Sequence, residues 1–525
     1  MRPQSDPVDD RFASAGREPW PAGLRARVRA LAGDESRYRW WVLVVLLAGL
    51  LSVNILFTVF VVALPSVAHG LHTSLPTVTW VVTGPMLASA VFAPLAGKAG
   101  DRLGHRRIYL GALGLSVVVA FLSATAPTVG VLIAVRVLAG LVGATLGATS
   151  MAMVLGAFPQ GERVKAMGWW SLVGAGGPVV GVAIGGFIIQ SIGWRWMFML
   201  EVFLGALAFL LAAVVLPEFA LGRDPGAHAG KRMDAAGAVL VVLGVGSLLF
   251  GLNRAPVLGW ASPVVLVAFV LAVAGIVALV LVELRAEDPL VPFSFIRRRN
   301  FAFPIGAQMG SNFAYMGGFF LAPLFLEAVY GKSESAAGLL VIPRPLTFSL
   351  VAPVAGYVAM KVGERTNALL GTSAVCASML VFAMTGHGTG VALVEVALVL
   401  SGIGMGVASP SLAATVANAA DQDSLGTASA TQQLMTQIAA IAGIQVMQTV
   451  QASRIQAGAS LLGSFHTAYL VGGAVAVLGV VCASALRSVD RSHVGAGEHR
   501  AIGTDGVAAL SGAGGMGEVL VPDEA

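Results

Sequence analysis

Four charged side chains lie inside long apolar stretches of this 525-residue sequence: Arg136, Glu201, Arg344 and Glu395. An uncompensated charge at the centre of a membrane segment costs at least about 2.5–3.5 kcal/mol, so each needs a partner, a cavity or water. A carboxyl group removed from water is also more easily protonated, which lets it take up and release a proton. These residue types therefore indicate ion pairing, proton transfer or the binding of an anionic group.

Each charge leaves alternatives open. We expect Arg136 to face a cavity or an acid, unless its side chain extends to the outer membrane surface. Glu201 and Glu395 are the candidate proton carriers, although each could be a solvated glutamate near that surface. An Arg136–Glu395 pair across a central cavity is one conceivable arrangement. Arg344 stands between two prolines and could bind an anionic substrate group or pair with Glu201 or Glu395.

Uncharged polar side chains are further candidates for substrate contact. Gln308, Asn312 and Tyr315 follow i, i+4, i+7 spacing and should share one face of a helix. Asn54 is strongly polar and lies in the first apolar segment, but an amide cannot carry a proton at physiological pH. Polar contact between helices would explain these residues equally well.

Composition indicates which elements must position these groups. Of all residues, 57% are hydrophobic and 11% are charged, whereas soluble proteins average about 45–50% and about 25%. The mean hydropathy is +0.83, and the apolar runs last about 20 residues, enough to cross a bilayer as a helix. We therefore predict an all-α polytopic membrane protein. Its fourteen segments lie near 40–66, 78–97, 108–126, 130–156, 166–190, 195–216, 234–253, 262–284, 302–326, 336–358, 367–386, 390–417, 425–450 and 465–486.

The distribution of basic residues predicts the orientation. With the N-terminus inside, cytoplasmic tails and loops hold 26 of the 32 Lys and Arg residues, as the positive-inside rule requires. Both termini are then cytoplasmic in a multi-pass plasma-membrane protein. Residues 1–39 and 487–525 are expected to be disordered tails.

A duplication organises the segments between these tails. Residues 93–97, Ala-Pro-Leu-Ala-Gly, recur 259 positions later as Ala-Pro-Val-Ala-Gly at 352–356. This repeat predicts two six-helix bundles, 40–216 and 302–486, joined by a linker of residues 217–301 with two additional transmembrane helices.

A charged run follows the first copy of this repeat. Residues 97–107 read Gly-Lys-Ala-Gly-Asp-Arg-Leu-Gly-His-Arg-Arg, and this run resembles the loop between helices two and three of the major facilitator superfamily. The resemblance implies a major facilitator fold and assigns a conformational latch to a set of loop residues. That gating set is Gly97, Asp101, Arg102, Gly104 and Arg106. The alternative is an ordinary cytoplasmic turn.

Four further motifs narrow the resemblance. Arg136, followed by Gly140, is similar to the family's intramembrane arginine signature, and Gly177, Pro178 and Gly181 are similar to its antiporter signature in helix five. Residues 193–198, Gly-Trp-Arg-Trp-Met-Phe, and the stretch 288–301 resemble the fourteen-helix drug:proton antiporter branch, the EmrB/QacA type.

The chain also departs from that branch. Leu56 stands where the branch usually has a helix-one aspartate, Met360 stands opposite Asp101 in the repeat, and Glu201 replaces an asparagine. The usual proton carrier is absent, so if transport is coupled to protons, Glu201 and Glu395 are the two candidates that could supply the coupling.

The resemblance implies a secondary active transporter, with proton-coupled efflux of amphipathic small molecules by alternating access. A uniporter or importer of an anionic metabolite is one alternative, and a non-transporting membrane scaffold or sensor is another. We expect no cofactor and no metal, because the two cysteines lie apart in apolar segments and no histidine spacing suits a metal. Neither ATP nor nucleic acid is an expected partner, and no nucleophile–base pair suggests an enzyme.

Overall fold

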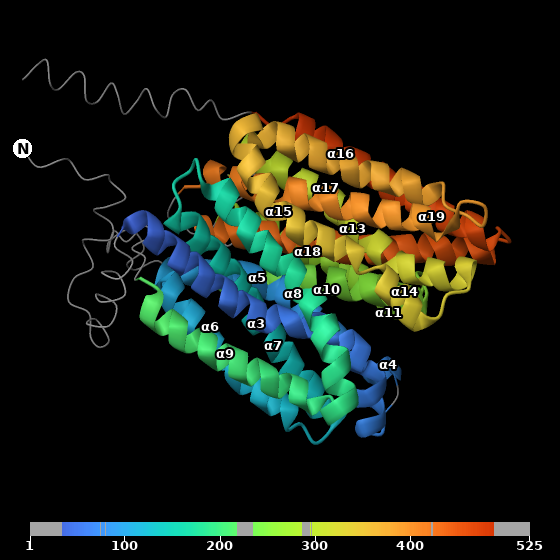
Figure 1. The fold of residues 1–525 in the computed structure, drawn as a ribbon, viewed down its shortest axis with the longest axis horizontal. Coiled ribbons are helices and arrows are strands. Elements are labelled where there is room, and N and C mark those ends of the chain that lie inside the picture. Colours follow the sequence, from blue (N-terminus) through green and yellow to red (C-terminus); the bar gives the residue numbers. More distant parts are fainter. Residues whose placement is uncertain are drawn as a thin grey trace, which may run out of the picture. The chain divides into compact units, whose positions relative to one another are not determined.

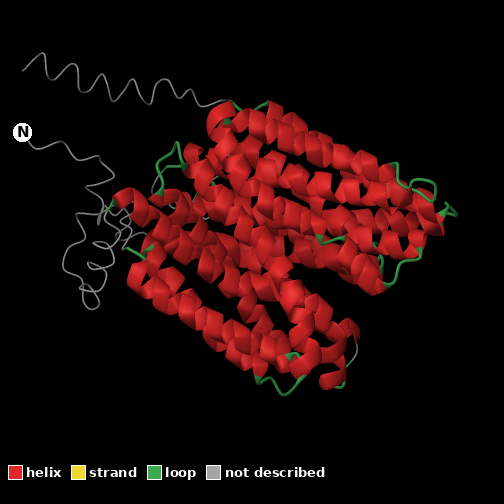
Figure 2. Ribbon diagram, in the orientation of Figure 1, coloured by secondary structure: helices red, strands yellow, loops and turns green. Residues whose placement is uncertain are grey.

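The computed structural model describes residues 34–487, apart from 74, 79, 218–234, 286–294, 296 and 422–423. In that part of the chain every regular element is a helix, as Figure 2 shows. The all-α fold class predicted from the apolar runs is confirmed. Most of the predicted terminal tails, residues 1–33 and 488–525, lie outside the described residues.

The first half of the fold is a bundle of long helices. They are α3 (Glu35–Gly70), α4 (Leu75–Val78), α5 (Trp80–Leu103), α6 (His105–Ala124), α7 (Val129–Ala157), α8 (Arg163–Ile192) and α9 (Arg195–Val215). α3 packs against α8 and α9, α5 against α7, and α6 against α7 and α9. The Tyr38 hydroxyl fastens α3 to the end of α9, because it donates to the Val215 carbonyl at 2.7 Å. Local sequence starts the helices: the Thr128 side chain accepts a hydrogen bond from the Val131 N–H and caps α7.

The second half repeats this plan. It contains α13 (Arg299–Tyr330), α14 (Glu334–Leu340), α15 (Pro343–Val362), α16 (Glu364–Ala383), α17 (Gly390–Ala419), α18 (Leu425–Gln456) and α19 (Leu461–Ser484). α13 packs against α18 and α19, and α17 packs against α15 and α16. Glycines set the closest approaches: a Cβ added to Gly371 would lie 2.5 Å from the backbone nitrogen of Ala408. Here α16 and α17 pack backbone against backbone, as small residues allow in membrane helices.

One predicted span, 336–358, is divided in the structure. α14 ends at Leu340 and α15 begins at Pro343. Neither Pro343 nor Pro345 has a backbone N–H, so neither can donate to the preceding turn, and proline is favoured at a helix start. The break places Arg344 at the beginning of α15.

Two helices lie between the halves in sequence, α10 (Ala235–Leu258) and α11 (Pro263–Glu283). They pack on each other through Gly244 and Gly275, where a Cβ on Gly275 would lie 2.7 Å from the Gly244 Cα. α10 also contacts α5 and α18. The outward side chains of α11 are apolar and exposed, such as Val270 at 67%.

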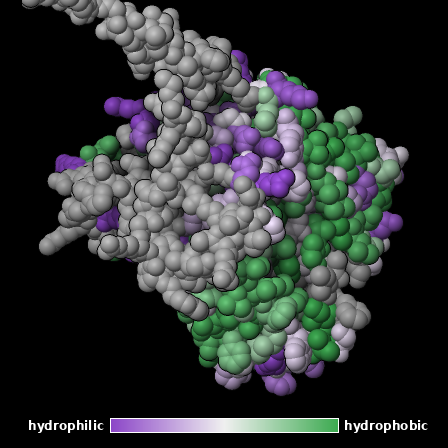
Figure 3. All heavy atoms as spheres, turned by 60° about the vertical axis from the view of Figure 1, so that its left-hand side comes forward, coloured by the Kyte–Doolittle hydropathy of each residue, from purple (hydrophilic) through white to green (hydrophobic). Residues whose placement is uncertain are grey.

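Exposed apolar side chains occur on other helices as well, for example Phe203 on α9 at 66% and Leu478 on α19 at 62%. Figure 3 shows large hydrophobic patches on the outer surface of the helices. A water-soluble protein rarely exposes contiguous apolar area of this extent, whereas a lipid bilayer solvates it. The molecule is therefore a multi-pass membrane protein.

The helix lengths agree with this environment. Eleven spans within the described residues are long and apolar enough to cross a membrane. The other predicted spans correspond to α8, α10 and α18, which have 30, 24 and 32 residues. At about 1.5 Å per residue, each exceeds the roughly 30 Å of a hydrocarbon core. The total of fourteen stays a prediction.

The most extensive contacts between the two halves are those of α5 with α18 and of α8 with α15. In Figure 1, α8 and α15 run next to each other between the blue-to-green half and the yellow-to-red half. In both pairs, the closest approaches of the backbones lie toward the same end of the molecule. We call this the basic end and define it by Gly104, which links α5 to α6, and by Gly363, which links α15 to α16. This junction and the buried charges away from it define the candidate sites.

Candidate functional site

Asp101 joins the two halves at the basic end. It lies in the last turn of α5, and its carboxylate accepts hydrogen bonds from the N–H groups of Gly426 at 2.9 Å and Thr427 at 2.8 Å. The Thr427 hydroxyl donates to the same carboxylate at 2.5 Å. These donors form the first turn of α18, where the helix dipole is positive and favours a negative group. An acid of one half therefore caps a helix of the other.

His105 is a second partner of this carboxylate. Its Nε2 lies 3.0 Å from Asp101 Oδ1, and both side chains are almost fully buried. Sequence reasoning did not single out His105. Its position four residues after Asp101 was the available signal, although Gly104 places the two residues on different helices.

The run 97–107, expected to be a loop, is almost entirely helical. α5 continues to Leu103 and α6 starts at His105, so Gly104 alone links them, with a φ of +95° that favours glycine. Gly97 is required for close packing and not for its backbone conformation, because a Cβ there would collide with the backbone carbonyl of Gly426. The absent side chain lets α5 and α18 touch.

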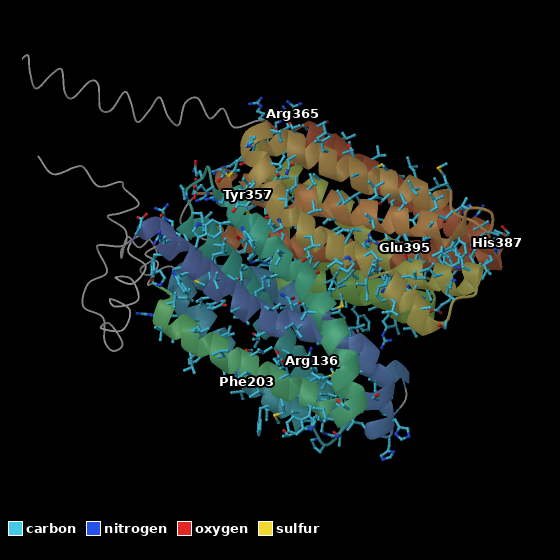
Figure 4. All side chains as sticks on the ribbon, viewed as in Figure 1. Arg136, Phe203, Tyr357, Arg365, His387 and Glu395 are labelled. Carbon is cyan, nitrogen blue, oxygen red and sulfur yellow. The ribbon has the colours of Figure 1, made fainter. Side chains whose placement is uncertain are left out.

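The arginines of this run differ in placement. Arg106 is buried and donates from Nη2 to the carbonyl oxygen of Ala213 at 3.1 Å, which ties α6 to α9 within the first half. Arg102 is partly exposed at the end of α5. In the repeat, Arg365 donates to the Ser484 carbonyl at 3.0 Å and ties α16 to α19, as Figure 4 helps to locate.

Where α8 crosses α15, the contact is apolar, whereas the crossing of α5 and α18 contains the charged Asp101. Met360, the counterpart of Asp101, packs against the buried cluster Val164, Ala359 and Ala414. A Cβ on Gly168 would lie 2.6 Å from the Ala352 carbonyl oxygen, so these helices also touch through glycine. The loss of the second acid is thus matched by apolar packing at the same crossing.

Arg163 adds a polar contact beside this cluster. It begins α8 and is 2% exposed. Its Nη1 donates to the carbonyl oxygen of Ala417 at 3.3 Å and to Asn418 Oδ1 at 3.0 Å, both at the C-terminal end of α17. Its Nε donates to the Leu155 carbonyl at 2.8 Å. A cation meets the negative end of a helix here, the inverse of the Asp101 contact. Nothing in the sequence distinguished Arg163 from the other basic loop residues.

Arg136 lies deep in the first half with Glu201. The guanidinium carbon is 5.7 Å from the centre of the Phe198 ring, and Phe198 precedes Glu201 by one turn of α9. Arg136 and Glu201 also attract each other electrostatically. Both side chains are buried, and Glu201 Oε2 has no hydrogen-bond partner among the described residues. The site thus holds an acid whose charge a neighbouring cation compensates.

Glu395 lies elsewhere, on α17 of the second half, and Figure 4 shows it well away from Arg136. The conceivable Arg136–Glu395 pair is therefore not formed in this conformation, because Arg136 lies near Phe198 and Glu201 of α9 in its own half. Glu395 is partly exposed, and its Oε1 is a buried atom without a hydrogen-bond partner in the described part of the chain.

Arg344 is fully buried in the second half, with 0% exposure. Its guanidinium stacks 3.9 Å from the centre of the Tyr315 ring, and Nη2 donates to the Tyr315 carbonyl oxygen. Neither Glu201 nor Glu395, the two acids considered as partners, makes an ion pair with it in the residues that the structure describes. The structure thus brings Arg344 together with Tyr315, which the sequence had placed in a separate set.

The remaining polar candidates are largely engaged by their own helices. Asn312 donates from Nδ2 to the Gln308 carbonyl at 3.1 Å, and Gln308 Oε1 is buried without a partner in the described residues. Asn54 donates to the Leu50 carbonyl at 3.0 Å. It also packs against the antiporter-type segment of α8, since a Cβ on Gly177 would lie 3.0 Å from Asn54 Cβ. Pro178 and Gly181 continue that segment along α8.

Candidate metal ligands are not clustered among the described residues. These residues contain no group of three or more His, Cys, Asp or Glu side chains that could hold a metal ion. Cys376 and Cys482 are free and partly buried.

Two helical bundles that approach each other most closely toward one end, with buried charges inside each bundle, are the architecture of an alternating-access membrane transporter. The comparison with protein families gives the class its name. The chain belongs to the Major Facilitator Superfamily, whose family model matches residues 45–444. The resemblance stated from the motifs is confirmed, and the chain is a secondary transporter of small molecules.

Several curated relatives carry names related to export or resistance. The chain is 29% identical over 417 residues to the tetracenomycin C resistance and export protein of Streptomyces glaucescens, covering 79% of this chain and 76% of the relative. It is 28% identical over 397 residues to the multidrug resistance protein Stp of Mycobacterium tuberculosis, covering 75% and 73%. The multidrug export protein EmrB of Escherichia coli is 30% identical over 309 residues, with 59% of each chain covered.

Solved structures agree at the level of the fold. The human organic anion transporter MFSD10 superposes with a TM-score of 0.61 at 17% identity, covering 85% of this chain and 99% of that chain. The proton:xylose symporter XylE superposes with a TM-score of 0.60 at 14% identity, covering 85% and 95%. At such identities the likeness concerns the fold alone.

Proposed function

We propose that this chain exports amphipathic small molecules from the cell in exchange for protons, and that Glu201 carries the proton. The single observation that carries the coupling is the buried acid Glu201 beside the buried cation Arg136, in a chain without the helix-one aspartate. The resistance and export names of the relatives support the direction and the substrate class.

Glu201 couples through its charge. In the ionised form it is attracted by Arg136, and the pair neutralises two charges that would be costly to bury separately. Protonation removes that attraction and leaves Arg136 to be stabilised by the Phe198 ring and by other groups. A proton that enters from outside thus changes the contacts between α7 and α9, and its release to the inside restores them.

The junction at the basic end acts as the latch of alternating access. Asp101, with Gly97, Gly104 and the arginines 102 and 106 around it, holds α5 of the first half to α18 of the second. Closure at this end corresponds to an outward-facing state, if the basic end is cytoplasmic as the positive-inside distribution indicates. Release of the α18 helix start from Asp101 then opens the inward-facing state.

This proposal includes the arrangement in the membrane. Residues 40–216 and 302–486 rock as two six-helix bodies, and the pair α10–α11 from the 217–301 linker remains peripheral in lipid. Both termini are cytoplasmic, and the plasma membrane is the site of action. The exposed apolar side chains of α11 support a lipid-facing position.

Proteoliposomes test the function directly. Full-length protein is reconstituted, a pH gradient is imposed, and accumulation of ethidium as an amphipathic probe is followed by fluorescence. We expect the gradient to drive uphill accumulation, and dissipation of the gradient to abolish it. Equal downhill flux with and without the gradient would contradict exchange and favour a uniporter. Absence of flux for ethidium and a panel of dyes and antibiotics would favour a scaffold or sensor.

A further inference from the structure

We propose that Arg344 and the aromatic residues around it bind the carboxylate of an anionic, aromatic substrate. This inference rests on the proposed export function, and it assigns a substrate class to a site that the proton pathway does not use. The site, which we call the Arg344 cage, consists of Arg344, Tyr315, Phe319 and Tyr469.

Arg344 is a buried cation that keeps free hydrogen-bond donors. Arg344 is 0% exposed, and its Nε and Nη1 are buried atoms without hydrogen-bond partners in the described residues. The groups that interact with it electrostatically are Tyr315 and Tyr469, not carboxylates. A buried arginine without an anion is costly, and guanidinium groups pair with carboxylates through strong hydrogen bonds. An anionic ligand would satisfy both the charge and the free donors.

Aromatic rings form the walls of the cage. The guanidinium lies over the Tyr315 ring at 3.9 Å and near the Phe319 ring at 5.7 Å. Tyr469 is fully buried, stacks on Phe382 at 4.7 Å, and its hydroxyl has no hydrogen-bond partner among the described residues. That hydroxyl is a second donor for an anion. Aromatic walls beside two donor groups suit a ligand with an apolar ring and a carboxylate.

Methionines and glycines surround the cage: a Cβ on Gly318 would lie 2.9 Å from Met379 Cε, and one on Gly472 would lie 2.9 Å from Met447 Sδ. Methionine side chains are flexible and adapt to irregular ligands. The break between α14 and α15 directly precedes Arg344, so movement of α15 can carry the guanidinium relative to its surroundings. The closed cage of this conformation can therefore open during the transport cycle.

Binding to the full-length protein in lipid nanodiscs tests the proposal. Benzoate serves as the probe, benzamide as its neutral analogue and chloride as a simple anion, each measured by isothermal titration calorimetry. We expect benzoate to bind the wild type, Arg344→Gln to weaken binding at least about tenfold, and Arg344→Lys to lose less. Benzamide should bind at least about tenfold more weakly than benzoate. Arg365→Gln is the matched control, because Arg365 lies at the basic end and bonds to the Ser484 carbonyl.

The outcomes separate this inference from the proposed function. Equal benzoate binding by the wild type and Arg344→Gln would overturn it, and so would chloride binding as tightly as benzoate. If Arg344→Gln fails to fold, Tyr469→Phe removes the second donor and should weaken benzoate binding several-fold; an unchanged affinity would again refute the cage. Ethidium export by the wild type tests the function separately, so export without Arg344-dependent benzoate binding contradicts the cage alone.

Discussion

Asp101→Asn should open the latch at the basic end. Asparagine keeps one acceptor oxygen but places an NH2 group where Asp101 Oδ2 now accepts from the Thr427 N–H at 2.8 Å and the Thr427 hydroxyl at 2.5 Å. Hydrogen bonds to a charged group contribute about 1.5–3 kcal/mol each, and the interaction of the charge with the α18 dipole is lost as well. We expect a net loss of about 2–4 kcal/mol, since the remaining amide oxygen can still accept from the Gly426 N–H.

A loss of about 2–4 kcal/mol shifts the equilibrium between states about 30- to 900-fold toward the state open at the basic end. The assay is the distance between spin labels on cysteines introduced at the exposed positions Arg107 and Thr366, after Cys376 and Cys482 have been replaced. The longer-distance population should become dominant in Asp101→Asn. Asp421→Asn is the matched control, because Asp421 lies near the same end but pairs with Arg298, which directly precedes α13, at 3.1 Å. An unchanged distance distribution in Asp101→Asn would refute the latch.

Three further substitutions at the junction should shift the equilibrium between the closed and open states by different amounts, measured as the distance between the same two spin labels. Met360→Asp adds an acid near the start of α8, so it should favour closure by about 0.3–1 kcal/mol and slow ethidium export; a shift toward opening would contradict the role of the helix dipole. Arg163→Gln removes charge from two contacts with the end of α17 and should favour opening about tenfold, with Arg298→Gln as control. Gly97→Val places a side chain against the Gly426 carbonyl and should prevent closure; normal closure would show that the α5–α18 approach is dispensable.

The fold could be predicted largely from the sequence. The length of an apolar run indicates a membrane-spanning helix, and the placement of Lys and Arg indicates its orientation, so neither depends on contacts between distant residues. The start of α7, for example, follows from the Thr128 cap. The break before Pro343 was missed, because the run of residues around it is continuously apolar and hydropathy takes no account of the backbone N–H that proline lacks. The helical extension of α5 to Leu103 was also missed, because glycine and charge suggested a loop where packing against α18 stabilises a helix.

The sites were less predictable, because their partners depend on helix rotation. Arg136 and Glu201 are far apart in sequence, and which acid faces Arg136 depends on how α7 and α9 turn toward each other. Arg344 and Tyr315 were singled out separately, yet the structure stacks them. Arg163 gave no signal at all, because its partners at the end of α17 are mainly backbone and amide oxygens, which no sequence pattern marks.

Proton-coupled export depends most directly on Glu201 as the proton carrier. The decisive measurement compares uphill, gradient-driven ethidium accumulation with exchange of labelled for unlabelled ethidium at equal pH, in proteoliposomes containing Glu201→Gln. A glutamine cannot cycle a proton, so we predict that accumulation falls at least about tenfold while exchange persists. Glu327→Gln, at the end of α13, should leave both activities unchanged. Full gradient-driven accumulation by Glu201→Gln, or its loss in Glu395→Gln alone, would contradict Glu201 as the proton carrier.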